Sequence, residues 1–226
     1  MMHNTNIVIV MFVVSTEKIL DQWRAYDSSY EELNGSLKEM ETRMRGSGGV
    51  VSTEPQPSLD AKRELCAKYT RYHAEVKDKQ SQFDSLSERT HLLMSSCSAD
   101  AAIASQLTQL SSRYTALLTF TKDTCKRLEQ QVDDHSQYRD AHDKAATWLA
   151  DMRQRLAAYT DTASTADRDE VQGQLERLHE FMALKEQGQT LLHAANTWGE
   201  KTLVTTSGEG RAVIQRELQV RASVPL

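Results

Sequence analysis

Histidine often serves as a catalytic residue or a metal ligand, and two arrangements of histidine in this chain match part of a metal-site pattern. Glu180 follows His179 directly, and His135 and His142 lie seven positions apart, on one face of a helix. A zinc helix requires a second histidine four positions from the first, and a metal requires a third ligand nearby. Both are missing, so the sequence predicts no metal site and ordinary seam or surface positions for the histidines.

Nucleophilic and phosphate chemistry also lack their usual context. The run Gly208-Glu-Gly-Arg211 has neither a preceding strand nor the Lys-Ser/Thr pair of a phosphate loop, and no serine sits in a strand-turn-helix context with a base. Cys66, Cys97 and Cys125 lack metal-ligand spacing, which predicts reduced thiols in a cytosolic or nuclear setting. The sequence thus predicts no catalytic, cofactor-binding or metal residues, and a protein that is not an enzyme.

Composition favours long helices over a compact enzyme core. The 226 residues are 26% charged and include only 3 prolines, and the mean hydropathy is −0.58; these values suit solvated helices with narrow apolar seams. A net charge of −5 offers no basic field for nucleic acid or anionic lipid. The apolar run Ile7 to Val14 is far shorter than the ~20 residues of a membrane span and lacks signal-peptide features.

The chain contains an internal repeat, and the offset between its copies changes only from one segment to the next. Residues 37–44 match 149–156 at an offset of 112, residues 69–76 match 175–182 at 106, and residues 103–107 match 214–218 at 111. Loops tolerate insertions better than packed helices do, so three helices per copy with loops of unequal length explain the offsets.

Each segment of the first copy carries a heptad, with seam residues spaced alternately four and three apart. We expect three antiparallel helices within 15–133, whose central seam side chains are buried together: Leu33, Leu37, Met40, Tyr69, Tyr72, Val76, Leu107, Leu110 and Tyr114. The third helix of this copy continues past Val132 toward Leu149 without a glycine or proline. The two copies should therefore share one continuous helix.

Helix breakers fall between the expected helices. Residues 46–57 and 160–167 form the first loop of each copy, with Ser58 and Asp167 as candidate helix caps. Gly199 and residues 205–210 mark the second loop of copy two. The heptad of copy two stops after Leu218, which predicts that this copy lacks most of its third helix. Seam side chains of its first two helices should then lose part of their cover: Trp148, Leu149, Met152, Leu175, Leu178 and Met182. We therefore expect the chain to be a fragment or an unusual isoform.

Two features stay open at this point. Lys79 and Lys185 occupy equivalent seam positions, as do Thr90 and Asn196, and could form a register-setting polar layer. We favour lysine stems that lie on the seam while the ammonium groups reach solvent. Residues 1–14 are an unassigned extension, either a non-native or fragment-derived start or a leading part of the first helix.

These patterns together resemble the spectrin repeat. The resemblance rests on the three-segment repeat, the pair Trp148-Leu149 in a first helix, the uninterrupted junction, and the Ile-x-x-x-Leu start of the third helix, and it covers nearly all of 15–220. The phrase from Trp198 to Leu218 is most similar to repeats of the nesprin (nuclear envelope spectrin-repeat) group, including the insect muscle-specific giant form. Copy one departs from the pattern, with Ser36-Leu37 where Trp-Leu is expected.

The resemblance implies an all-α fold of tandem three-helix coiled-coil bundles sharing a linker helix, with repeat one at 15–133 and an incomplete repeat two at 134–226. It implies a structural rod segment of a giant cytoskeletal linker, which as in nesprins tethers the nucleus to the cytoskeleton, in the cytoplasm or at the outer nuclear membrane. Its partners would be cytoskeletal or nuclear-envelope proteins, with no cofactor, nucleic acid or membrane insertion. The alternatives are a helical protein-binding module and the rod of a dystrophin-like or spectraplakin-like actin-crosslinking protein.

Overall fold

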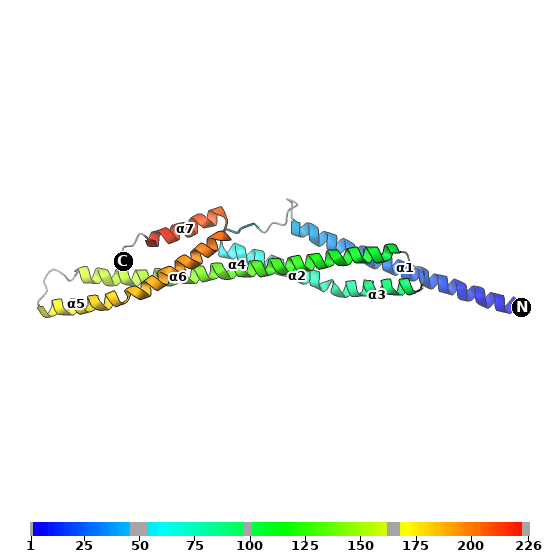
Figure 1. The fold of residues 1–226 in the computed structure, drawn as a ribbon, viewed down its shortest axis with the longest axis horizontal. Helices are drawn as coiled ribbons and strands as arrows, with labels where there is room; N and C mark the ends of the chain where they lie inside the picture. Colours follow the sequence, from blue (N-terminus) through cyan, green and yellow to red (C-terminus); the bar gives the residue numbers. More distant parts are fainter. Residues whose placement is uncertain (1, 46–53, 97–100, 162–167, 223–226) are drawn as a thin grey trace. The chain divides into compact units, whose positions relative to one another are not determined.

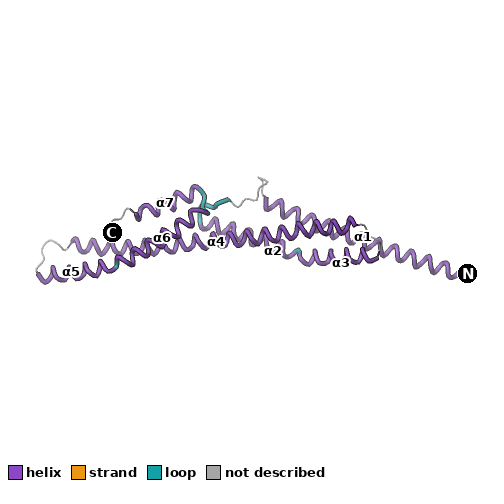
Figure 2. Tube along the Cα trace, in the orientation of Figure 1, coloured by secondary structure: helices purple, strands orange, loops and turns teal. Residues whose placement is uncertain are grey.

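The computed structural model describes residues 2–45, 54–96, 101–161 and 168–222, and almost all of them are helical (Figures 1 and 2). The helices are α1 (Met2–Arg45), α2 (Leu59–Asp78), α3 (Gln80–Ser96), α4 (Ala101–Asp161), α5 (Arg168–Ala183), α6 (Lys185–Val204) and α7 (Gly208–Ala222). The predicted all-α class is confirmed.

The chain forms two compact units that interleave along the sequence. Unit 1 comprises residues 1–53 and 67–126, and unit 2 comprises residues 54–66 and 127–226. Helix α2 therefore begins in unit 2 and ends in unit 1. The repeat boundaries predicted from the sequence remain a prediction, and each unit is described separately below.

Unit 1 is a three-helix bundle built from α1, the α2–α3 pair and the first half of α4. Cross-helix pairs give the directions: Arg43 contacts Glu75 and Glu32 contacts Gln82, so α1 is antiparallel to α2–α3. The Tyr114 hydroxyl donates to Gln80, 2.9 Å away. Together with the 3.0 Å contact between His73 and Thr121, this makes α4 antiparallel to α2–α3 as well.

The core of unit 1 confirms the predicted seam. Its buried side chains come from seam positions of α1, the α2–α3 pair and α4: Tyr26, Leu33, Leu37, Met40, Met44, Val76, Leu86, Leu93, Ile103, Leu110, Tyr114 and Leu117. Tyr72 and Leu107 were expected to be buried with them but are half-buried and pack against this core. Tyr69 is also buried. Since each buried aliphatic side chain contributes about 1.5–3 kcal/mol through the hydrophobic effect, this seam is the main source of stability in unit 1.

The long middle helix of each copy is interrupted at nearly equivalent positions. Helix α2 ends at Asp78 and α3 begins at Gln80, with Lys79 in a turn whose N–H reaches back to Val76 at 3.1 Å. Helix α5 ends at Ala183 and α6 begins at Lys185. Lys79 is half-buried and Lys185 is exposed, which agrees with lysine stems on the seam and ammonium groups in solvent.

Helix α4 is 61 residues long and has no break between Ala101 and Asp161. The predicted continuous helix shared by the two copies is confirmed. No glycine or proline occurs in its sequence, so no residue removes a backbone hydrogen bond or loosens the backbone along its length.

Unit 2 contains the start of α2, the second half of α4, the α5–α6 pair and α7. The expected break at Gly199 is wrong, since α6 runs through it to Val204, and α7 begins at Gly208, inside the expected loop. Ala141, Ala145 and Ala195 form a small buried core, with Leu191, Leu192 and Trp198 packed on it. These small residues allow α4 and α6 to approach closely. The prediction that Leu149 and Met152 lose cover is wrong, since they are 8% and 7% exposed.

The exposed seam residues of unit 2 lie on α5 and at the end of α4. We define the open stripe as the side chains that are 44–56% exposed there: Leu156, Val171, Leu175, Leu178 and Met182. For Leu175, Leu178 and Met182, the expected loss of cover is confirmed.

The N-terminal extension is helical from Met2 and continuous with α1. Met11 and Phe12 are 68% and 71% exposed. The structure thus agrees with a leading part of the first helix for this extension. Among the described residues, no helix combines the length and apolar character that crossing a membrane requires.

Candidate functional site

The most unusual site in the described part of the chain is a buried amine in unit 2. Lys62 lies in the first turns of α2 and is 1% exposed. Ser58 starts this helix as predicted, since its Oγ accepts a hydrogen bond from the Ala61 N–H at 3.2 Å. Lys62 precedes Leu65 by three positions and Tyr69 by seven, so it continues the seam toward the helix start. Burial follows from that register.

Two threonines at the turn between α6 and α7 hold the Lys62 amine. Its Nζ donates to Thr205 Oγ1 at 3.0 Å and to Thr206 Oγ1 at 3.1 Å. The Thr206 hydroxyl in turn donates to the Thr202 carbonyl oxygen at 2.7 Å. Burial lowers the pKa of Lys62 to about 8, although the nearby Asp134 carboxylate acts in the opposite direction.

Asp134 on α4 supplies the negative charge of this site. Its carboxylate accepts a hydrogen bond from the Gln130 side chain and forms an ion pair with Lys201, each at 2.8 Å. The residue is 5% exposed. The Thr202 hydroxyl donates to the Asp134 main-chain carbonyl oxygen at 3.2 Å. Asp134 thus attaches α6 to α4 at the same level as the lysine.

His135 is the second buried base of the site. It is 5% exposed, and its Nδ1 has no hydrogen-bond partner among the described residues. Burial lowers the pKa of His135 to about 4, and the cations Lys62, Arg139 and Arg63 act in the same direction. The imidazole is therefore neutral at pH 7. We call Lys62, Asp134, His135, Thr202, Thr205 and Thr206 the lysine cluster.

The backbone just before α2 also joins this site. Gln56 and Thr206 form an isolated parallel bridge, in which the Ser207 N–H donates to the Gln56 carbonyl oxygen at 3.2 Å. A side chain at Gly210 would overlap the Pro57 carbonyl oxygen, so glycine permits the close approach of α7. This pairing of residues 150 or more positions apart has no signal in the heptads.

Helix α7 is anchored to α4 by Glu217. Its carboxylate accepts hydrogen bonds from the Tyr138 hydroxyl at 2.5 Å and from Arg139 at 3.1 Å. The His142 ring lies 3.8 Å from the same carboxylate. His142 therefore belongs to a polar contact between two helices, and the predicted seam position of His135 is confirmed by its burial.

The geometry of the lysine cluster is that of a structural contact. An amine with a lowered pKa can act as a nucleophile or base where a substrate reaches it. Lys62 is covered by the α6–α7 turn, and two of its three N–H donors point at threonine hydroxyls. The cluster can thus fix the position of one segment against another.

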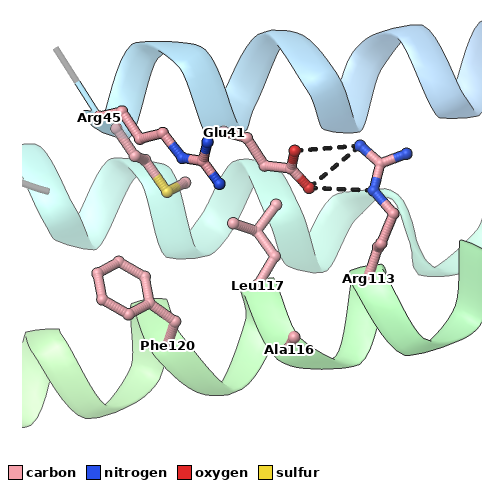
Figure 3. Close-up of a pocket in the computed structure, with 7 residues that line it drawn as sticks. Glu41, Arg45, Arg113, Ala116, Leu117 and Phe120 are labelled. Carbon is pink, nitrogen blue, oxygen red and sulfur yellow. Dashed lines mark hydrogen bonds and ion pairs between the residues drawn. The ribbon is translucent and has the colours of Figure 1, made fainter. Parts of the chain in front are cut away.

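Unit 1 has an open pocket of about 240 Å³ between α1 and α4 (Figure 3). Met44, Leu117 and Phe120 give it apolar walls, and Arg45 lies at its edge. The Arg113 guanidinium is paired with the Glu41 carboxylate at 3.1 Å. The pocket therefore has apolar walls and one ion pair, in which the Arg113 and Glu41 charges neutralise each other.

The other residues singled out from the sequence lie apart from the lysine cluster. His179 and Glu180 are exposed on α5, and Asn196 is exposed on α6. Thr90 is buried and donates to the Leu86 carbonyl oxygen at 2.8 Å, as a seam threonine does. Cys97 and Asp167 fall outside the described residues. Within the described ranges, no group of three or more metal-ligating side chains is present.

Comparison with known proteins identifies the family. The spectrin-repeat family model matches residues 17–130. The chain is 27% identical over 202 residues to Muscle-specific protein 300 kDa of Drosophila melanogaster, an alignment that covers 89% of this chain and 2% of that protein. This agrees with the resemblance to the insect muscle-specific giant form, while no solved structure matches the chain. The chain belongs to the spectrin-repeat family.

Proposed function

We propose that this chain is a tension-bearing rod segment of a giant cytoskeletal linker, and that the parent protein tethers the nucleus to the cytoskeleton. The observation that supports this most is the unbroken helix α4, which supplies the third helix of one repeat and the first helix of the next. Its similarity to a 2% portion of a very large muscle protein fits a segment of a long array.

A continuous helix matters because it offers no loop at which force can separate the repeats. Each α4 residue between the two cores is held by backbone hydrogen bonds to the turns before and after it. An applied force must therefore break backbone hydrogen bonds of α4 before it can pull the two repeats apart. A structural role of this kind requires buried seams and matched surface charges, such as the pair Arg43–Glu75.

The linkage can be tested by interrupting α4 at Gln131, where the helix passes from one core toward the other. Gln131→Pro removes a backbone hydrogen bond and should destabilise the helix by about 3 kcal/mol. In single-molecule stretching of the full chain, we expect the unmodified protein to unfold in coupled events and the proline variant in two separate ones. Gln131→Ala is the matched control and should keep the coupling. Two independent transitions in the unmodified chain would overturn the linkage.

The tethering part of the proposal is tested in cells. The partners would be cytoskeletal or nuclear-envelope proteins bound by other parts of the parent, which would lie in the cytoplasm and at the outer nuclear membrane. Antibodies raised against this chain should stain the nuclear rim in muscle of the source organism. Staining confined to actin-rich structures away from nuclei would favour the dystrophin-like or spectraplakin-like alternative.

A further inference from the structure

The first residues of α2 and the short segment before them pack with unit 2, while the rest of α2 packs with unit 1. We call residues 54–66 the strap. It is held by a backbone bridge at Gln56 and by the two hydrogen bonds of the Lys62 amine. These contacts all lie within a few residues of one another, so the strap can dock or leave as one piece.

We propose that the strap is a two-state latch, docked on the α6–α7 turn while His135 is neutral and released when His135 takes up a proton. In the docked state the Lys62 and His135 side chains are both buried, at 1% and 5% exposure, and the Lys62 charge acts on His135. A proton on His135 would add a second positive charge, besides the Lys62 ammonium, to the same buried site. Two like charges in such a site repel strongly.

The charges around His135 set the direction of this response. Lys62 and Arg63 on the strap and Arg139 on α4 disfavour imidazolium, whereas Glu217 on α7 favours it. The adjacent Asp134 carboxylate is already engaged by Lys201 of α6 and by Gln130. The balance in the docked state disfavours a proton on His135.

Releasing the strap reverses this balance. Two of the opposing cations, Lys62 and Arg63, leave with the strap, and water reaches the imidazole. The pKa of His135 then moves from about 4 toward the ordinary value of 6.5. Because the released state binds the proton more tightly, acid shifts the equilibrium toward release in the window between pH 6.5 and 4. The latch depends on unit 2 alone, whatever the parent protein tethers.

The test is amide hydrogen exchange on the full chain at pH 7.5 and pH 5, corrected for the intrinsic exchange rate. With pKa values of about 4 docked and about 6.5 released, the protection of peptides covering 54–66 should fall by up to about 30-fold at pH 5. Peptides from α3 in unit 1 serve as the internal reference and should keep their protection. An equal fall in both regions, or no fall in the strap, overturns the latch.

Variants assign the response to His135. His135→Gln should abolish the fall in strap protection, and His193→Gln, at an exposed position of α6, should leave it intact. Lys62→Met removes a facing cation and should reduce the fall. Should His135→Gln fail to fold, the titration of the His135 ring by NMR in the unmodified protein decides: an apparent pKa near 6.5 overturns the proposal, and a value well below it supports it.

Discussion

Equivalent seam positions in the two repeats have very different surroundings. Tyr69 and Val76 in α2 are 2% and 0% exposed, whereas their counterparts Leu175 and Met182 in α5 are 46% and 56% exposed. The same apolar spacing thus gives a buried seam in one copy and an open stripe in the other. A heptad specifies which face of a helix is apolar, and a third helix is needed to cover it.

The third helices account for the contrast. In unit 1, Leu110, Tyr114 and Leu117 of α4 extend the buried core well beyond Ile103. In α7, the position equivalent to Leu110 is Arg221, a charged residue in place of an apolar seam residue. The lysine cluster and the Glu217 carboxylate hold the described part of α7 in place. Unit 2 therefore combines a small apolar core with a polar anchor.

The largest expected effect comes from emptying a covered seam position. Leu37→Ala in α1 removes a 0% exposed side chain and should lower the free energy of unfolding by about 2–5 kcal/mol. Leu178→Ala on the open stripe is the matched control, at 44% exposure, and should change it by less than about 0.5 kcal/mol. Urea unfolding of both variants measures the contrast. Similar losses would mean that the open stripe is covered in solution.

A pair of glycines tests the comparison within unit 2. A methyl group at Gly188 of α6 would overlap the Trp148 ring, while one at Gly173 of α5 would meet nothing within 4 Å. Gly188→Ala should destabilise by about 1–3 kcal/mol through overpacking, offset in part by its better helix propensity. Gly173→Ala should stabilise by up to about 1 kcal/mol. Thermal unfolding followed by circular dichroism should shift in opposite directions for the two, and shifts of the same sign would contradict the packing described.

The smallest expected effect is a change in the stability of unit 2 with pH, which comes from the buried Lys62 amine. Lys62 loses its proton near pH 8 when folded and near 10.5 when unfolded, so between these values the unfolded chain binds more protons. The free energy of unfolding of unit 2 should therefore rise with pH, by about 1 kcal/mol between pH 7 and 9. Buried polar residues of unit 1, such as Thr90 and Thr121, are neutral throughout.

The check is urea unfolding of the unmodified chain and of Lys62→Met at both pH values, followed by hydrogen exchange of peptides from each unit. The rise should be confined to unit 2 and disappear in Lys62→Met. A rise of equal size in the variant would show that the Lys62 amine is not its source.

Spacing within one segment was enough to predict the helices and much of the core. The four-three pattern from Leu33 to Met44 predicted a buried face, and the absence of breakers after Val132 predicted the continuous α4. Both features depend on residues less than a few turns apart, which is the range over which helical periodicity acts.

Contacts between distant segments had no comparable signal. The neighbours of Lys62 in the sequence are charged, as is typical of a solvent-exposed helix start. The two threonines that hold its amine lie in a turn 143 and 144 positions away. Lys62 lies three positions before Leu65, the first apolar residue of the seam, and only the turn at Thr205 and Thr206 gives its amine a partner. The bridge at Gln56 depends on the same turn and was equally inaccessible to pattern analysis.

The interleaving of the two units has a consequence for how such arrays evolve. Residues 54–66 fall within the first predicted repeat, 15–133, but pack with unit 2. Deleting the second repeat at its sequence boundary would remove the turn at Thr205 and Thr206 and leave the Lys62 amine without these two partners. A duplication or deletion is therefore expected to be better tolerated when its boundaries keep residues 54–66 together with the α6–α7 turn, and such a boundary does not coincide with the repeat seen in the sequence.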